Sequence, residues 1–148
     1  MYKRILIATD GSPLSHRAIV NGIDIAKATG AAVLGVHVRP PKSTVYYGES
    51  IVVLPRDVDE ALERQSLDED QSYLAEIQAA ANDAGIPYSA AHPRSDTPAD
   101  GILQVAEEGL CDLIVMASHG RRGFSRILLG SEANKVVTHA QVPVLVTH

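Results

Sequence analysis

A glycine-rich segment near the C-terminus combines residue types that suit an anion site. An apolar run, residues 112–116, precedes it, and Ser131 follows it at the start of a stretch with helical character. A strand, a glycine-rich turn and a helix N-terminus in that order direct free backbone N–H groups and the positive end of the helix dipole at one point. Gly120 and Gly130 would let the backbone approach a phosphate closely, and Ser131 can cap the helix and donate its hydroxyl. The segment therefore predicts a phosphate-binding turn with a nucleotide as its ligand.

Three arginines, Arg121, Arg122 and Arg126, lie inside the same segment. The chain as a whole carries a formal net charge of −5, whereas a nucleic-acid partner requires a basic face that neutralises its phosphates. The composition therefore argues against nucleic acid as a partner. The local arginine cluster is better matched to the few phosphates of a nucleotide.

Apolar runs alternate with helical patterns along all 148 residues, a length that suits one domain (residues 1–148). Ser12 and Pro13 fit the cap and first position of a helix, and Gly30 fits its end. We expect strands at residues 2–8, 32–38, 86–92, 112–117 and 142–147, and helices at 12–29, 58–84, 98–108 and 131–140. This alternation predicts an α/β fold, a doubly wound five-stranded parallel sheet with the strand order 3-2-1-4-5.

In such a sheet, ligands bind at the carboxyl ends of the strands, where the strand order reverses. With the first and fourth strands as neighbours, the ends at residues 8–10 and 117–120 border one crevice. Asp10 is then the acid at its mouth, facing ribose hydroxyls or a metal-bound phosphate. Alternatively, its carboxylate caps the first helix through the amides of Ser12 and Leu14, and one carboxylate can serve both roles.

Two apolar residues border the same crevice. Val38 closes the second strand, where it would lie against a base or offer its backbone to the base edge. Met116 would pack on the base from the other side. For both residues, a place in the hydrophobic core is an equally good interpretation.

The glycine-rich segment resembles the nucleotide loop of the universal stress protein family. That loop is Gly, two residues, Gly, nine residues, Gly and then Ser or Thr, and here Gly120, Gly130 and Ser131 match its last three marks. Ala117 stands at the first mark in place of glycine. Residues 5–12 (ILIATDGS) and 142–146 (VPVLV) are similar to the family's first and last strands, so the resemblance spans the chain.

This resemblance implies a Rossmann-like fold of the adenine nucleotide alpha hydrolase type, ATP as the ligand, and a homodimer joined through the last strand. It places Asp10 and the pair His37-Val38 at the nucleotide. Mg²⁺ would accompany the ATP phosphates, with Asp10 as a direct or water-mediated ligand. The candidate nucleotide-binding residues are Ala8, Thr9, Asp10, Val38, Met116, Ala117, Ser118, His119, Gly120, Arg121, Arg122, Gly123, Gly130, Ser131 and Glu132.

No catalytic machinery is evident beside this site. The sequence lacks the Gly-x-x-x-x-Gly-Lys-Ser/Thr loop of P-loop ATPases and the Gly-x-Ser-x-Gly elbow of α/β-hydrolases. A site that holds a nucleotide without favouring a transition state is a sensor rather than a catalyst. We therefore expect an ATP-binding regulator of the stress response, whose occupancy changes a surface that an unidentified protein partner reads.

Two other functions remain open. The first is slow ATP hydrolysis or autophosphorylation at Ser118, Ser125 or Ser131. The second is a dimeric interaction module with an empty nucleotide site, which Ala117 in place of glycine favours.

Residues 39–56 show neither a helical nor an alternating pattern, and they contain Pro40, Pro41, Gly48 and Pro55. Connections of this length are uncommon in compact domains unless they serve a function. A loop folded back over the sheet edge, a lid over the nucleotide and a subunit contact are three interpretations of this segment.

The last strand carries apolar groups on both faces, and we expect it at the edge of the sheet. Pairing with its copy in a second subunit would cover that edge. Pro143 has no N–H and would limit the pairing at its own position.

The remaining reactive residue types predict no further site. The six histidines lack the paired spacing of a zinc site, and His119 alone lies in the crevice, where packing of the turn is the main interpretation. The acidic run 68–70 is assigned to the solvated face of the long helix, and Cys111 to a small inert hydrophobe. A single cysteine, no apolar run of membrane-spanning length and no signal peptide indicate a cytoplasmic protein without a membrane partner.

Overall fold

The computed structural model describes residues 1–41, 45–47, 50–52, 54–120 and 129–148. Its centre is a five-stranded parallel sheet made of β1 (Arg4–Ala8), β2 (Ala32–Val36), β5 (Tyr88–Ala91), β6 (Leu113–Ala117) and β7 (Val144–Thr147). The order across the sheet, β5-β2-β1-β6-β7, is the predicted 3-2-1-4-5. The doubly wound α/β fold is confirmed.

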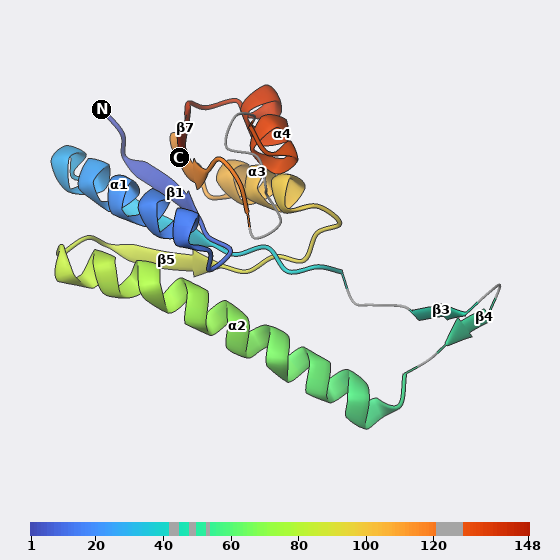
Figure 1. The fold of residues 1–148 in the computed structure, drawn as a ribbon. Coiled ribbons are helices and arrows are strands. Elements are labelled where there is room, and N and C mark those ends of the chain that lie inside the picture. Colours follow the sequence, from blue (N-terminus) through green and yellow to red (C-terminus); the bar gives the residue numbers. More distant parts are fainter. Residues whose placement is uncertain (42–44, 48–49, 53, 121–128) are drawn as a thin grey trace.

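Helices cover both faces of the sheet (Figure 1). In β1, Ile5 and Ile7 pack in one core with α1 (Pro13–Thr29) and α2 (Arg56–Asp83). Leu6 and Ala8, which point to the opposite face, pack in a second core with α3 (Pro98–Glu108) and α4 (Ser131–His139). Because successive side chains of a strand alternate between faces, the almost unbroken apolar run of β1 serves both cores.

The ends of α1 follow the signals in its sequence. Ser12 caps the helix, since its hydroxyl accepts a hydrogen bond from the N–H of Ser15 at 3.2 Å, and Pro13 occupies the first helical position. Gly30 ends it in the left-handed conformation, with φ of 70°, where an L side chain is disfavoured.

The start of α4 differs from the prediction. Gly130, with φ of −59° and ψ of 154°, is the residue that caps the helix, and Ser131 is its first helical residue. The predicted capping role of Ser131 is therefore wrong. A cap must hold extended dihedrals, and it is Gly130 that lies in that conformation.

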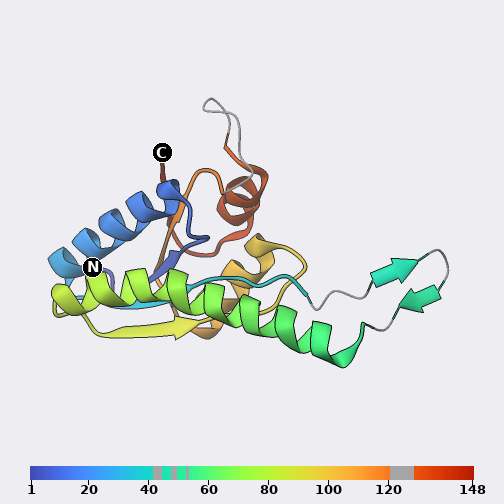
Figure 2. The ribbon, with the colours of Figure 1, turned by 60° about the horizontal axis from the view of Figure 1, so that its bottom comes forward.

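A short hairpin occupies part of the segment that we expected to be irregular. β3 (Val45–Tyr47) pairs antiparallel with β4 (Ser50–Val52), and the two form a sheet of their own. Figures 1 and 2 show the hairpin standing away from the main sheet, beyond the N-terminal end of α2. The interpretation as a loop folded back over the sheet edge is therefore wrong, because the segment pairs with itself.

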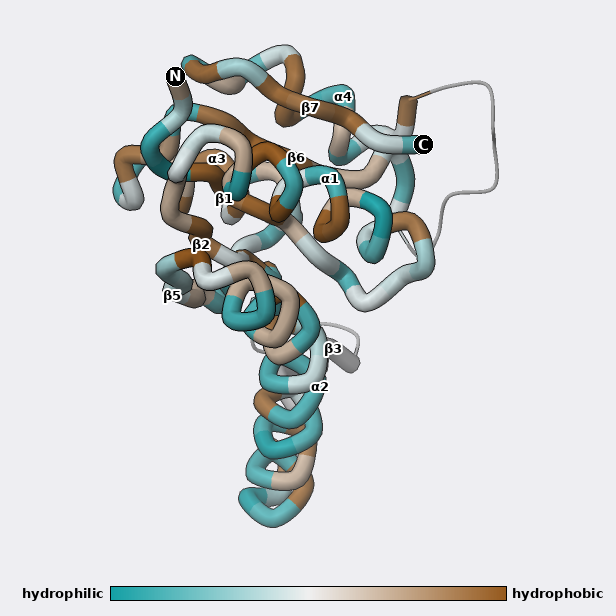
Figure 3. The backbone as a smooth tube through the Cα atoms, turned by 90° about the vertical axis from the view of Figure 1, so that its left-hand side faces the viewer, coloured by the Kyte–Doolittle hydropathy of each residue, from teal (hydrophilic) through white to brown (hydrophobic). Residues whose placement is uncertain are grey.

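The long helix α2 projects from the sheet with its N-terminal half (Figure 3). Its buried residues, Asp70, Leu74, Ile77 and Ala81, all lie in the second half of the helix. Asp70 is only 2% exposed, so its assignment to the solvated face is wrong. A buried carboxylate costs several kcal/mol unless it is paired, and Asp70 is paired with His37 and Arg39.

Cys111 precedes β6 and is buried at 5% exposure. Burial raises the pKa of its thiol, which keeps the sulfur in its unreactive protonated form at neutral pH. Across the part of the chain that the structure describes, no helix is long and apolar enough to cross a membrane.

A polar cluster ties α3 to α4. The ammonium group of Lys135 donates to Asp100 at 2.8 Å and to the hydroxyl of Thr97 at 3.1 Å, and that hydroxyl donates to Asp100 at 2.7 Å. The hydrogen bonds from Lys135 and Thr97 hold the pKa of the Asp100 carboxyl below its usual value. Folding therefore favours the charged form of Asp100.

We expect Asp100→Asn to lower the free energy of unfolding at neutral pH but not in acid. A depressed folded-state pKa contributes stability above the usual carboxyl pKa of about 4, and this contribution is lost as the pH falls through the lowered value. Denaturant titrations of both proteins near neutral pH and at about pH 3 test this, with Asp24→Asn, an exposed site on α1, as the control. An equal difference from the wild type at both pH values would contradict the prediction.

Candidate functional site

A cavity of about 730 Å³ lies at the carboxyl ends of the parallel strands. Its volume is within the usual range for small-molecule sites. Every candidate residue that the structure describes lines it: Ala8, Thr9, Asp10, Val38, Met116, Ala117, Ser118, His119, Gly120, Gly130, Ser131 and Glu132. Arg121, Arg122 and Gly123, together with Ser125 and Arg126, lie outside the described residues. The structure thus brings the described candidates together, while their contact with a ligand stays a prediction.

The turn after β1 shapes one wall of the cavity. Asp10 accepts a hydrogen bond from the N–H of Ser12 at 3.0 Å, one of the two amides in the capping interpretation, while Ser12 itself is the cap residue of α1. Gly11, with φ of 73°, lets the chain turn sharply into α1, and the hydroxyl of Thr9 accepts from its N–H at 3.2 Å. These contacts fix the Asp10 carboxylate at the cavity wall.

Gly120 and Gly130 are required by close packing within the protein itself. A Cβ atom on Gly120 would lie 2.8 Å from Oδ2 of Asp10, and one on Gly130 would lie 2.7 Å from the carbonyl oxygen of Ser118. The N–H of Gly130 also donates to that carbonyl at 2.9 Å. The start of α4 is therefore held directly against the end of β6. This explains the glycines without reference to a ligand, and it leaves room for one.

The chain beyond β2 forms the opposite wall. The N–H groups of His37 and Arg39 donate to carbonyls on the β5 side, at Ala91 (3.2 Å) and Pro93 (2.8 Å). Because backbone polar groups alternate in direction along an extended chain, the N–H and C=O of Val38 point the other way, past the end of β1 and into the cavity. No described residue hydrogen-bonds to these two groups.

The side chain of Val38 packs against α3. A Cβ atom on Gly101 would come within 2.6 Å of Cγ1 of Val38. Met116 is 6% exposed and belongs to the core on the same side of the sheet. The core interpretation therefore holds for both residues, although both also border the cavity.

Two candidates at the α4 end have partners within the protein. Glu132 accepts a hydrogen bond from the N–H of Ala99 at 2.8 Å, so its carboxylate joins the N-termini of α3 and α4. A ring nitrogen of His119 lies 3.1 Å from the hydroxyl of Ser118, which is consistent with packing of the turn.

Several residues that line the cavity were not predicted from the sequence. Arg39 and Pro40 follow Val38, and Ser95 and Asp96 follow β5. The rule that ligands bind at the carboxyl ends of parallel strands, if applied to the third predicted strand as well, would have found Ser95 and Asp96.

Within the described ranges, no three histidine, cysteine or acidic side chains gather in a way that would hold a metal ion. Mg²⁺ is nevertheless commonly held by one or two carboxylates together with substrate phosphates and water. The Asp10 carboxylate supplies a suitable oxygen at the cavity wall.

Comparison with known proteins matches the chain over its whole length. A model described as the universal stress protein family matches residues 1–148. A universal stress protein of Thermus aquaticus is 37% identical over 145 residues, which cover 98% of this chain and 98% of that protein. One from Methanocaldococcus jannaschii is 35% identical over 147 residues, which cover 99% of this chain and 82% of that protein.

Solved structures share the fold. The structure of the hypothetical protein MJ0577 has a TM-score of 0.81 at 25% identity, covering 99% of this chain and 96% of that one. A universal stress protein family protein of Arabidopsis thaliana, solved with AMP bound, has a TM-score of 0.67 at 21% identity, covering 97% and 90% of the two chains. The family model matches the whole chain, and the two relatives are 37% and 35% identical to it over nearly its full length: this chain belongs to the universal stress protein family.

Proposed function

We propose that this protein binds an adenine nucleotide, ATP in particular, in the cavity and acts as a nucleotide-dependent regulator in the stress response. The observation that carries the proposal is a cavity of about 730 Å³ with a different chemistry at each end. One end has the start of a helix, and the other has an open backbone donor and acceptor.

The α4 end suits phosphate. No described side chain caps α4, so the N–H groups of its first turn are available to an anion, and the helix dipole adds favourable charge there. Gly130 and Ser131 line the cavity at this point. Mg²⁺, held by the phosphates and by Asp10, would complete the ligand.

The β2 end suits adenine. The N–H and C=O of Val38 point into the cavity side by side, and the base edge of adenine presents an acceptor at N1 next to a donor at the N6 amino group. Guanine presents the reverse pattern on the same edge, a donor at N1 next to an acceptor at O6. The backbone of Val38 therefore favours adenine over guanine.

Regulation fits this site better than turnover does. The described residues at the α4 end supply backbone donors. The hydroxyl of Ser118 lies next to a ring nitrogen of His119, but Ser118 is only 1% exposed, so this pair is poorly placed to attack a phosphate. The protein of Arabidopsis thaliana with the same fold was solved with AMP bound, which supports an adenine nucleotide as the ligand.

The first experiment is to denature freshly purified protein and identify any released nucleotide by chromatography. The stripped protein is then titrated by calorimetry with AMP, with ATP alone and with ATP plus Mg²⁺. Co-purified adenine nucleotide, or binding with micromolar affinity, would support the proposal. No released nucleotide and no binding heat would reject it and favour a module that works through protein contacts alone.

We also propose a homodimer joined through β7, because β7 is the last strand of the sheet. Its residues Val144, Leu145 and Val146 are only half-buried, and an open apolar strand edge requires a cover. We expect wild-type protein to sediment as a dimer, and Val146→Lys to sediment as a monomer. Val20→Lys, at an exposed valine on α1, is the control that stays dimeric. A monomeric wild type, or a dimeric Val146→Lys protein, would contradict the prediction.

A further inference from the structure

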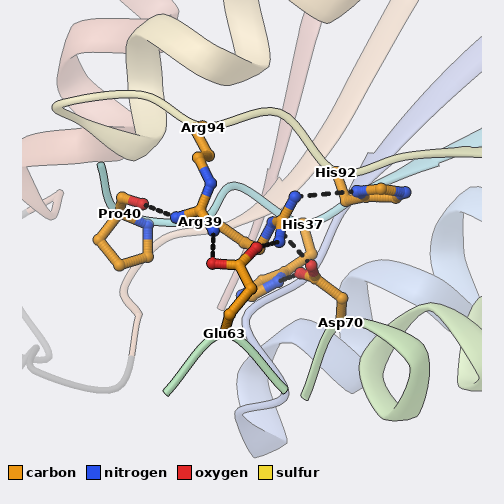
Figure 4. A network of polar contacts seen from close by, with 7 residues as sticks. All are labelled: His37, Arg39, Pro40, Glu63, Asp70, His92 and Arg94. Carbon is orange, nitrogen blue, oxygen red and sulfur yellow. Dashed lines mark hydrogen bonds and ion pairs between the residues drawn. The ribbon is translucent and has the colours of Figure 1, made fainter. Parts of the chain in front are cut away.

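The buried carboxylate of Asp70 connects α2 to the cavity wall. Its two oxygens have separate partners, both from the chain beyond β2 (Figure 4). Oδ1 accepts a hydrogen bond from Nδ1 of His37, and Oδ2 forms an ion pair with Nε of Arg39 at 2.9 Å. The side chains of all three residues are largely buried, with 3% exposure for Asp70, 15% for His37 and 11% for Arg39. One carboxylate thus holds two residues of the same extended segment, His37 and Arg39.

The residue between these two partners is Val38. Side chains at alternate positions of an extended chain point to the same face, so His37 and Arg39 reach α2 together while Val38 reaches α3. The N–H and C=O of Val38 then face the cavity, as described above. The direction of these two groups depends on the dihedral angles of the segment, and Asp70 constrains the residues on either side.

A second carboxylate of α2 extends the same network. Glu63 lies two helical turns before Asp70, on the same side of the helix. It pairs with Nη1 of Arg39 at 3.3 Å and with Arg94, while Nη1 of Arg94 donates to the carbonyl of Pro40 at 3.0 Å. The other end of the Arg39 guanidinium lies 3.4 Å from a ring nitrogen of His92. α2 therefore fixes the chain on both sides of Arg39, and it does so without Asp70 lining the cavity itself.

We propose that Asp70 is a positioning residue for the nucleotide base. Its carboxylate holds His37 and Arg39, and through them the backbone of Val38, in the orientation that reads the base edge. The inference rests on the proposed function, since it concerns the base end of the same site. It predicts that a residue buried in α2 sets the preference for adenine over guanine.

The test compares Asp70→Asn with Asp68→Asn, a change of the same chemistry at an exposed position of the same helix. The asparagine keeps the shape of the side chain but presents an amide in place of the charged oxygen that pairs with Arg39. We expect the ratio of AMP affinity to GMP affinity, measured by calorimetry, to fall about tenfold in Asp70→Asn. A loss of about tenfold is the lower end of the effect on metal affinity or activity when a residue that orients a metal ligand is replaced. Asp68→Asn is expected to keep the wild-type ratio, and the nitrogen-NMR signal of the His37 ring is expected to shift in Asp70→Asn alone.

An unchanged AMP-to-GMP ratio in folded Asp70→Asn protein would overturn the inference, because a merely structural role lowers stability without changing base preference. If Asp70→Asn does not fold, His37→Gln, which leaves the pair with Arg39, is judged by the same ratio.

If wild-type protein binds neither nucleotide, the proposed function fails, and the positioning role is judged on the free protein. Faster amide hydrogen exchange at His37 and Arg39 in Asp70→Asn than in Asp68→Asn would then support it, and equal exchange would overturn it.

Discussion

Gly130→Ala is expected to weaken AMP binding about a hundredfold while the protein stays folded, because it displaces first-turn N–H donors, and a hydrogen bond to a charged group contributes about 1.5–3 kcal/mol. The added Cβ atom would lie 2.7 Å from the carbonyl oxygen of Ser118, a backbone atom at the end of β6 that cannot rotate away. The start of α4 must therefore move off the sheet. This displaces the first-turn N–H groups from the phosphate position and lengthens the hydrogen bond from Gly130 to Ser118, now 2.9 Å.

Gly22→Ala is the matched control for this prediction. Gly22 lies in α1, and a Cβ atom there would lie 2.6 Å from Cδ1 of Ile7, the flexible end of a side chain. We expect this change to alter thermal stability and to leave AMP affinity near the wild-type value. Calorimetry at matched protein concentrations measures both affinities. Wild-type affinity in Gly130→Ala would mean that the position of α4 does not matter to the ligand.

The sheet and its helices were predictable because their signals are local. Short apolar runs located the strands of the main sheet, and Ser12, Pro13 and Gly30 marked the ends of α1 as predicted. The β3–β4 hairpin was missed because it stands apart from the core. A strand with no buried face does not require apolar residues at alternate positions, so no alternating pattern marks it. Its short strands therefore carry little signal in the sequence.

The site was predictable in outline but not in its internal contacts. The spacing of Gly120 and Gly130 identified the loop, yet the need for glycine comes from Asp10 and Ser118, and no local pattern reveals such a contact. Asp70 is the clearest case, since it lies in an acidic run typical of a solvated helix face. Its burial follows from His37 and Arg39, which approach only when β2 and α2 pack together.

The two ends of the cavity are held by separate parts of the protein. The α4 end depends on contacts among β1, β6 and α4, whereas the β2 end depends on α2 through Asp70 and Glu63. Substitutions at the two ends should therefore have distinguishable effects. Those at the α4 end should lower affinity for all nucleotides, and those at the β2 end should alter the choice of base.

Asp10→Asn is expected to lower AMP affinity about tenfold, because a hydrogen bond to a charged group contributes about 1.5–3 kcal/mol. Asparagine retains an oxygen that can accept from the N–H of Ser12, now at 3.0 Å, so the turn into α1 should survive the change. What is lost is the negative charge at the cavity wall, which would accept hydrogen bonds from ribose hydroxyls. Asp24→Asn on the exposed face of α1 is the control, with wild-type affinity expected.

The same variant tests the proposed Mg²⁺ ligand. Titrations with AMP in the absence of metal isolate the contact of Asp10 with the nucleoside, whereas titrations with ATP plus Mg²⁺ add its contact with the ion. If Asp10 also holds Mg²⁺, the affinity loss for ATP plus Mg²⁺ will exceed the loss for AMP, because a divalent ion interacts more strongly with a carboxylate than with a neutral amide. Equal losses would mean that Asp10 contacts the nucleoside alone. In titrations with ATP alone, a higher affinity of Asp10→Asn would be consistent with relief of repulsion between the carboxylate and the phosphates. AMP affinity unchanged in Asp10→Asn would exclude Asp10 from nucleoside binding and leave capping of α1 as the role that its geometry supports.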